Sequence, residues 1–362
     1  MTRATVDVAI IGAGAAGSAA ACVIAPGASV ALIDRIATPQ WRIGESLPGA
    51  AHRLLKTIGA WPRFVAAHHG PALLKISRWG SDRTVELDPM RDPDGAGWHL
   101  DRARFEADLR ATALDHGAVF HHARVRTVAR TPTGWSLSLD SGTVVAARRL
   151  IDASGRRSRL LAAFGQHKLV VDRLACVYAR IAAGSRYDPV TYTHAVESGW
   201  WYTAVVPGGE RLVAYHCDSD SPALRATLKE GPLAAARRVP GLAEAIGQIE
   251  RSRATSPEVC AANTIARSAA GHGWLAAGDA AMALDPLSSQ GLFNALATGL
   301  EAGDATLALI AGDDAATPRF AERMRLIWQA YLRHHALYYG METRWPDAEF
   351  WSRRQVDTGS MR

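Results

Sequence analysis

Three glycines in one turn near the N-terminus constrain the fold of this sequence more than any other feature. The segment 7–34 reads DVAIIGAGAAGSAAACVIAPGASVALID and places Gly12, Gly14 and Gly17 between an apolar run and an alanine-rich stretch. In a strand-to-helix turn of this type, the first glycine permits the tight turn, the second lets backbone approach a pyrophosphate, and the third lets helix and strand pack closely. The spacing predicts a βαβ unit that binds a dinucleotide, with a glycine-rich packing turn as the alternative.

The residues around this turn complete the predicted dinucleotide site. Asp34 ends the apolar run VALID, at about the 20-residue spacing of an acid that accepts hydrogen bonds from ribose hydroxyls. The pyrophosphate would lie at the start of the helix, beside Ala15 and Ala16, where unpaired N–H groups and the helix dipole favour negative charge. We also expect Arg35, which follows the acid, to contact the cofactor.

Composition indicates a globular protein without a membrane span. The chain has 362 residues, of which 48% are apolar, and this length can hold two or three subdomains. Residues 8–33 carry no charge, but glycine, alanine and Pro26 make up most of this run, whereas a spanning helix needs sustained large apolar residues. The Met-Thr-Arg start leads into a strand with no room for a signal peptide, which favours the cytoplasm.

Charge and cysteine usage narrow the possible ligands. The net charge is +6, and the basic residues are scattered among acids, which suits a phosphate-bearing ligand but offers no nucleic-acid motif. The four cysteines are far apart and have no zinc-type spacing, which indicates buried free thiols and predicts no metal site. They are Cys22, Cys176, Cys217 and Cys260.

The rest of the chain alternates between strand-like and helix-like segments. Residues 50–61 and the segment from Asp101 to Gly117 show helical spacing, while residues 73–89 alternate like two strands joined by a turn at 80–82. Residues 168–265 are β-rich apart from a helical insert at 224–238. This order indicates a second, β-rich layer beside the dinucleotide unit.

A second nucleotide-site motif lies far from the first in the sequence. The segment 273–291, GWLAAGDAAMALDPLSSQG, places Asp279 after a strand and Gly291 at the start of a long helix. Here the chain resembles the glutathione-reductase-type FAD monooxygenase superfamily. The resemblance implies that Gly278 and Asp279 hold the ribityl chain, and that the helix beginning at Gly291 points its N-terminus at the flavin pyrimidine, where positive potential stabilises the reduced ring. It also implies cofactor contacts by Pro286, Ser289 and Gln290, while packing alone is the alternative for Gly278-Asp279.

Three further segments extend the resemblance in the family's order: RIGESLPG at 42–49, GWHLDRARFEADL at 97–109 and DASGRRS at 152–158. By this match Arg42 and Arg102 would lie along the FAD, with surface salt bridges as the alternative for both. The same match adds Glu45, Ser46 and the backbone of Val125, the last beside the adenine, to the cofactor site.

The DASGRRS segment bears on the electron donor. Ser154 replaces the aspartate of the family's second fingerprint. Direct use of NAD(P)H and supply through a separate flavin reductase therefore both stay open.

The resemblance implies an α/β fold with three parts. These are a Rossmann-like FAD-binding domain, a β-sheet substrate domain and a C-terminal helical segment. We expect the first to comprise residues 1–78, 97–165 and 266–315, the second 79–96 and 166–265, and the third 316–362.

Within the superfamily the chain is similar to the tryptophan-halogenase-like branch, which includes flavin hydroxylases and the LodB-like, GoxB-like and QhpG-like maturases of quinocofactor enzymes. It departs from true halogenases at three places. Pro71 stands where the tunnel lysine should be, Ser288 to Gly291 replace the E-S-T-G run, and Tyr202 replaces the second tryptophan of the W-x-W-x-I-P segment. Halogenation therefore becomes the less favoured interpretation.

The expected function is an FAD-dependent monooxygenase that uses O₂ and a C4a-hydroperoxyflavin to hydroxylate an indole or phenol, on a small molecule or on a tryptophan of a partner polypeptide. Candidate catalytic residues are Glu45, Lys75 and Tyr202, although Glu45 could instead hold the flavin loop, and His99 is more simply structural. The alternatives are a halogenase, a maturation factor or chaperone with little turnover, and a flavin dehydrogenase or ene-reductase. The aromatic C-terminus is expected to form a core cover, or else a rim around the substrate opening or a partner site.

Overall fold

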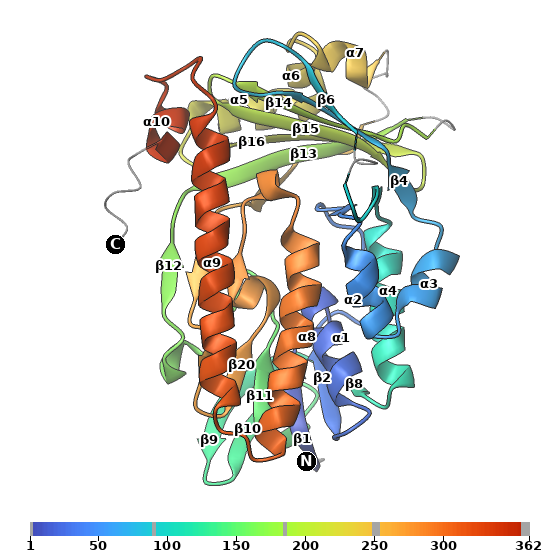
Figure 1. Ribbon diagram of the computed structural model, residues 1–362, viewed down its shortest axis with the longest axis vertical. Coiled ribbons are helices and arrows are strands. Elements are labelled where there is room, and N and C mark those ends of the chain that lie inside the picture. The colour runs from blue at the N-terminus through green and yellow to red at the C-terminus, as the bar shows by residue number, and fades with distance from the viewer. Residues whose placement is uncertain (1–2, 89–91, 184–186, 248–253, 356–362) are drawn as a thin grey trace.

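The computed structural model describes residues 3–88, 92–183, 187–247 and 254–355. Two large sheets organise this part of the chain (Figure 1). One lies with the N-terminal βαβ unit and the helices that cover it, and the other lies across the ends of the long helices α8 (Gly291–Ile310) and α9 (Ala316–Gly340) (Figure 1).

The first sheet has eight strands and contains the dinucleotide fold. Its central strands β20, β11, β1, β2 and β8 are parallel, as expected for a doubly wound unit. Val8, Ala9 and Ile10 are fully buried, which explains why their strand reads as a continuous apolar run. The strands of this sheet are β1 (Arg3–Ile11), β2 (Val30–Asp34), β8 (Val119–His122), β9 (Val125–Thr131), β10 (Gly134–Leu139), β11 (Val144–Asp152), β19 (Ala270–Gly271) and β20 (Trp274–Ala276).

Small residues let α8 lie against α1 (Ala15–Ile24). A Cβ atom on Gly299 would come within 2.3 Å of the Ala16 carbonyl oxygen, and one on Gly303 within 2.7 Å of the Val23 side chain. Only glycine permits this approach. The close packing fixes where the N-terminus of α8 lies relative to the glycine turn.

The second sheet has seven strands and a distinct face on each side. Its order is β17-β13-β16-β15-β14-β5-β6, mostly antiparallel. The strands are β5 (Leu74–Arg78), β6 (Val85–Leu87), β13 (Leu174–Ala182), β14 (Val190–Val196), β15 (Gly199–Val206), β16 (Glu210–Asp218) and β17 (Glu258–Ala261).

Alternating side chains bury both faces of this sheet. On the outer face, Trp201, Val213 and Tyr215 pack against residues of α6 (Pro232–Ala236) and α7 (Leu242–Ile246). We call the other side the inner face; it carries Tyr178, Trp200, Tyr202, Ala214 and His216 in register. Its apolar residues pack against Tyr339 of α9 and against Phe350 and Trp351 of α10 (Glu349–Gln355).

Two small sheets and several helices connect these layers. One sheet pairs β7 with β3 and β4, and the other pairs β18 with β12 and β21. These strands are β3 (Ser46–Leu47), β4 (Gly70–Ala72), β7 (Gly97–His99), β12 (Lys168–Val170), β18 (Ile265–Arg267) and β21 (Met282–Ala283). The remaining helices are α2 (Ala51–Thr57), α3 (Trp61–Ala66), α4 (Arg102–Asp115), α5 (Pro222–Glu230) and the 3₁₀ turns η2 (Ala162–Phe164), η4 (Gly278–Ala280) and η5 (Pro286–Ser288).

Most expected elements are confirmed, with two differences. The helix expected over 50–61 ends at Thr57, because Gly59 adopts a positive φ of 73°, and a separate helix, α3, begins at Trp61. Strand β5 belongs to the seven-stranded sheet, since Lys75 pairs with Thr191, although our division assigned residues 1–78 to the FAD-binding domain. The division into domains otherwise stays a prediction.

The α/β fold class itself is confirmed. The chain combines a Rossmann-like unit, a β-sheet layer and a C-terminal helical segment. The C-terminal aromatic residues mostly form the cover that we expected, because Tyr339 and Trp351 are fully buried, whereas Tyr338 is exposed. Among the described residues, no helix is both long and apolar enough to cross a membrane.

Candidate functional site

The three glycines of the first turn have different surroundings, as their separate tasks require. A Cβ atom on Gly12, whose φ is 102°, would lie 2.2 Å from the Ala153 carbonyl oxygen, and one on Gly17 would lie 1.8 Å from the Gly12 carbonyl oxygen. Gly14 differs, because its nearest neighbour would be Arg42 Nη2 at 3.5 Å. Gly12 and Gly17 thus close the turn, while the Gly14 backbone is accessible beside the Arg42 guanidinium.

Asp34 is tied to this turn by its carboxylate. The Ala13 N–H donates to Asp34 Oδ2 at 2.7 Å, and the Ile36 N–H donates to Oδ1 at 2.8 Å. Each oxygen retains acceptor capacity for a ribose hydroxyl. Of the other adenosine-side candidates, Val125 is buried at the start of β9 and Arg35 is exposed.

Both predicted arginines converge on one carboxylate. Arg42 and Arg102 donate to Glu106 Oε1, from Arg42 Nε at 2.9 Å and from Arg102 Nη2 at 2.5 Å. The Arg102 and Glu106 side chains are 6% and 9% exposed, while Arg42 is 51% exposed and faces the Gly14 side of the turn. Although burial raises the pKa of Glu106, the two guanidiniums outweigh it and hold this pKa below its usual value. Glu106 therefore holds Arg42 beside Gly14, where the sequence predicts the pyrophosphate, while Arg102 stays in the interior.

This buried pair leads to a stability prediction. A Glu106→Gln substitution leaves the Arg102 guanidinium without its counter-charge, and removal of one partner from a buried ion pair typically costs about 3–5 kcal/mol. Because Arg102 also donates to the Ile43 carbonyl, we expect the lower end, about 3 kcal/mol, in the free energy of unfolding measured with urea. The matched control is Asp108→Asn, which breaks the more exposed Arg104–Asp108 pair on the same helix and should cost less than about 1 kcal/mol. Equal losses in the two variants would contradict the assignment.

The second motif meets the first at Ala16. A Cβ atom on Gly278 would lie 2.8 Å from Ala16 Cβ, and the Gly278 N–H donates to Thr298 Oγ1 of α8 at 2.8 Å. Asp279 lies next to Arg156, whose Nε is 3.7 Å from Asp279 Oδ2. The predicted ribityl-binding acid is thus adjacent to the first turn of α1.

The N-terminus of α8 also has open space around it. Gly291 would have no atom within 4 Å of an added Cβ, and the preceding Gln290 gives no side-chain cap. Ser289 adopts a left-handed φ of 51°, which is unusual for a non-glycine residue. Pro286 is exposed in the same loop. The uncapped N–H groups of α8 can therefore hold an electronegative group, as the predicted flavin contact requires.

The GES segment contributes a buried polar pair. The Tyr202 hydroxyl donates to Glu45 Oε1 at 2.5 Å, and Ser46 Oγ lies 3.2 Å from the same hydroxyl. Glu45 is 3% exposed, and its Oε2 accepts from the Gly44 N–H. Burial, followed by the neighbouring Glu45, raises the pKa of Tyr202 well above its usual value, so Tyr202 is protonated in the resting protein. Glu45 and Tyr202, predicted separately from the sequence, are thus joined by a direct hydrogen bond.

Among the described residues, the Lys75 and His99 side chains make no direct hydrogen bond with Glu45 or Tyr202. Lys75 is on the inner face with Thr191, and although its side chain is exposed to solvent, the surrounding protein lowers the pKa of the ammonium by desolvation. His99 is fully buried, with Nδ1 2.9 Å from the Tyr187 hydroxyl and Nε2 2.8 Å from Thr191 Oγ1. Since both ring nitrogens are occupied, His99 has the structural role that the sequence suggested.

A network around Asp285 was not predicted from the sequence. This buried carboxylate accepts from the Leu287 N–H through Oδ1 and from the Tyr339 hydroxyl through Oδ2, both at 2.8 Å, and His335 Nε2 lies 3.4 Å from Oδ2. Trp200 Nε1 donates to the Tyr339 hydroxyl at 3.1 Å. The network links α9 to the loop before α8 and to the inner face. Only the Asp-Pro pair before a helical turn could have indicated Asp285 as a cap, and the i,i+4 spacing from Arg102 could have indicated Glu106.

Asp285 also belongs to the one cluster of three metal-type ligands found among the described residues. Ligand atoms of Asp172, Asp285 and His335 lie within 4.8 Å of one another. However, Asp172 already accepts from the Leu174 and Thr264 N–H groups, and Asp285 is engaged as above. These hydrogen bonds explain why the three side chains lie close together.

Several buried histidines predict a pH-dependent stability. Burial lowers the pKa of His99 to about 4 and that of His216 to about 3, whereas both titrate near 6.5 in the unfolded chain. The unfolded state therefore binds more protons between these values, so stability is full above about pH 6.5 and falls as the pH drops toward 4. Urea unfolding across this range should show the fall, and His99→Gln should reduce its slope by about 1.4 kcal/mol per pH unit. Substitution of the exposed His272 serves as the control. A slope that His99→Gln leaves unchanged would contradict the prediction.

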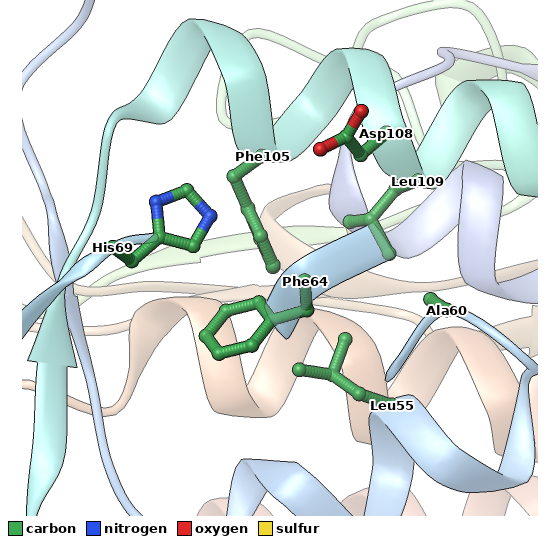
Figure 2. A pocket seen from close by; sticks show the side chains of 7 residues that line it. All are labelled: Leu55, Ala60, Phe64, His69, Phe105, Asp108 and Leu109. Carbon is green, nitrogen blue, oxygen red and sulfur yellow. The ribbon is translucent and has the colours of Figure 1, made fainter. Parts of the chain in front are cut away.

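A small cavity between α2, α3 and α4 is too small for a substrate. Phe64, His69 and Phe105 line it with other mainly apolar residues (Figure 2). Its volume is about 10 Å³, which is roughly that of one water molecule. The space that the glycines leave open, rather than this cavity, is the candidate site.

Comparison with known proteins agrees with this geometry. Residues 81–360 match the tryptophan halogenase family, and the chain belongs to that family. LodB of Marinomonas mediterranea, described as an FAD-dependent oxidoreductase, is 27% identical in an alignment of 363 positions that covers 97% of each chain. The predicted resemblance to this branch is confirmed.

Solved structures share the fold. The myxobacterial chondrochloren halogenase CndH has a TM-score of 0.86 at 23% identity, covering 99% of this chain and 87% of its own. The peptidyl tryptophan dihydroxylase QhpG has a TM-score of 0.77 at 23% identity, with coverages of 99% and 81%. The protein is therefore an FAD-dependent oxidoreductase by family. The accessible Gly14 backbone, Arg42 and the open helix N-terminus at Gly291 fit such a cofactor.

Proposed function

We propose that this protein is an FAD-dependent monooxygenase that hydroxylates an indole or a phenol. The observation that carries the proposal is the buried Glu45–Tyr202 pair, on an aromatic inner face beside the cofactor site. FAD, when bound, supplies the activated oxygen for transfer to an electron-rich ring. NAD(P)H would provide the electrons, directly or through a separate flavin reductase, with O₂ as the co-substrate.

The residues of the inner face would orient the substrate ring and remove a proton from its hydroxyl or N–H group. Tyr202 would accept the proton of the substrate hydroxyl or N–H and pass its own to Glu45 Oε1, because that hydrogen bond is already formed at 2.5 Å. Loss of this proton raises the electron density of the ring, and general-base help of this type contributes about 10²–10⁴-fold. Trp200 and Tyr178, which are buried in the same cluster, would help exclude water.

The substrate group could belong to a small molecule or to a tryptophan of a partner polypeptide. The resemblance to quinocofactor maturases described above supports the polypeptide, and the similarity to LodB extends over nearly the whole chain. QhpG, which shares the fold, is named as a dihydroxylase of peptidyl tryptophan in quinone cofactor biogenesis. We therefore favour a polypeptide tryptophan within the class of aromatic substrates.

A halogenase is the second candidate, supported by family membership and by the fold shared with CndH. The replacement of the E-S-T-G run and of the tunnel lysine position argues against it. A maturation factor with little turnover is the third candidate, since LodB-like proteins serve other enzymes in the resemblance described above.

Product mass distinguishes these candidates. The purified protein with FAD, NADH and a flavin reductase would be supplied with ¹⁸O₂, chloride and bromide, and with three probes: indole, phenol and a tryptophan-containing peptide. One ¹⁸O atom in a product is the expected result. Chlorine or bromine in the product would establish the halogenase instead, and O₂ uptake without any modified probe would favour the maturation factor.

A further inference from the structure

Two of the four free cysteines face each other across neighbouring strands. Cys176 of β13 and Cys260 of β17 are direct partners in the antiparallel register. Two residues along, the Ala262 N–H donates to the Leu174 carbonyl at 3.0 Å, so the cysteine pair belongs to the hydrogen-bonded type. The Cα atoms of such a pair are about 5.5 Å apart, which is within the usual range for a disulfide.

The two thiols have different environments. Cys176 is 1% exposed, and burial raises the pKa of its thiol well above the usual value. Cys260 is half-buried; the neighbouring Cys176 thiol, aided by the nearby Arg156, lowers the pKa of its thiol although burial opposes this. Cys260 is therefore the more accessible of the two and the one beside the Arg156 cation, with Cys176 behind it as the resolving thiol.

Arg156 fixes this environment next to the cofactor site. Its Nη2 donates to the Leu284 carbonyl at 3.3 Å, and its Nε lies 3.7 Å from Asp279 Oδ2. It also donates to the Asn263 carbonyl, three residues after Cys260. The charge that activates Cys260 is thus held by backbone rather than supplied by a mobile surface residue.

The pair also lies in the wall of the inner face. Trp200, His216, Cys176 and Cys260 occupy one register row across four strands. A bond between the two sulfur atoms would tie the edge strand β17 to β13 at the end of this row.

We propose that Cys176 and Cys260 form a redox modification site that a hydroperoxide converts to a reversible disulfide. The Cys260 thiolate attacks one oxygen of the hydroperoxide, the O–O bond breaks, and Cys260 becomes a sulfenic acid. The Cys176 thiol then loses its proton and attacks the Cys260 sulfur, and hydroxide leaves as water. With hydrogen peroxide, two thiols are oxidised and one peroxide is reduced to two waters. The proposal does not depend on which reaction the flavin performs.

The other two cysteines serve as internal controls. Cys22 is buried in α1, and burial raises the pKa of its thiol to about 12. Cys217 pairs in register with Ala175 and lies on the other side of the sheet, where burial also raises its pKa to about 12. Neither has a cysteine opposite it.

The test uses the FAD-loaded full-length protein and added hydrogen peroxide. After treatment, alkylation under denaturing conditions should find two of the four thiols lost, and a non-reducing digest should contain a peptide joined through Cys176 and Cys260. Dithiothreitol should restore all four thiols. Loss of thiols at Cys22 or Cys217, or no loss at peroxide concentrations that oxidise a free cysteine peptide, would overturn the proposal.

Variants separate the two steps. Cys176→Ser should stop at a sulfenic acid on Cys260 that dimedone labels, and Cys260→Ser should lose thiols at least tenfold more slowly. Cys217→Ser should still lose two thiols. If the cysteine variants fail to fold, the peptide map of the unmodified protein decides alone, because it identifies the joined residues directly.

Discussion

A Gly14→Ala variant is expected to fold but to lose most of its FAD, whereas a Gly17→Ala variant is expected not to fold. The added Cβ at position 17 would lie 1.8 Å from the Gly12 carbonyl oxygen, an overlap with backbone that side-chain motion cannot relieve. At position 14 the nearest atom would be Arg42 Nη2 at 3.5 Å, which is ordinary contact. The methyl group would instead occupy the space where a pyrophosphate approaches the helix N-terminus.

Flavin absorbance and circular dichroism measure these two outcomes independently. For Gly14→Ala we expect an unchanged far-ultraviolet spectrum and FAD affinity at least tenfold weaker in a titration of the apoprotein. Gly340→Ala is a suitable control, because Gly340, like Gly14, has no positive φ, and no atom lies within 4 Å of the added group. A Gly14→Ala protein that retains full FAD affinity would remove the dinucleotide assignment from this turn.

The parts of this site that the sequence predicts are those in which one short segment determines the geometry. The three glycines and Asp34 belong to a single βαβ unit, so their spacing specifies the turn, the helix start and the acid together. The same holds for the start of α8 at Gly291, where the residue pattern is local.

Other features depend on residues that only the fold brings together. Glu106 meets Arg42 across 64 positions of the chain, and Asp285 meets Tyr339 across 54. Nothing in either segment specifies the partner. The placement of β5 shows the same limit, because Leu74–Arg78 could end the first layer or begin the second until β14 supplies its neighbour.

The candidate catalytic residues illustrate both cases. Glu45 and Tyr202 are candidates for separate reasons, one in the GES segment and one on a strand 157 residues away. Their hydrogen bond forms because the fold brings the GES segment against Tyr202 of β15. Lys75 lies on the same face of the sheet as Tyr202. A sequence pattern can therefore place residues on strands, but their pairing across layers comes from tertiary structure.

Glu45→Gln is expected to lower the rate of product formation by about 10²–10⁴-fold while FAD stays bound. The amide preserves the size of the side chain and can still accept the Tyr202 hydroxyl hydrogen bond, but it cannot take up a proton from Tyr202 at neutral pH. Tyr202→Phe removes the other half of the relay and should give a similar loss. Because the two residues would act as one unit, the double variant should be no slower than the slower single variant.

The comparison with Lys75→Met decides which group handles the proton. Lys75 lies on the inner face, yet the Glu45–Tyr202 pair is complete without it, so Lys75→Met should retain a rate within a few-fold of the unmodified protein. Rates would be measured under single turnover with reduced flavin, and flavin absorbance would verify that each variant is loaded. A large loss in Lys75→Met with little loss in Glu45→Gln would reverse the assignment and favour a lysine-dependent halogenase. Full additivity in the Glu45 and Tyr202 double variant would instead mean that the two residues contribute separately, as a flavin-loop contact and a substrate contact.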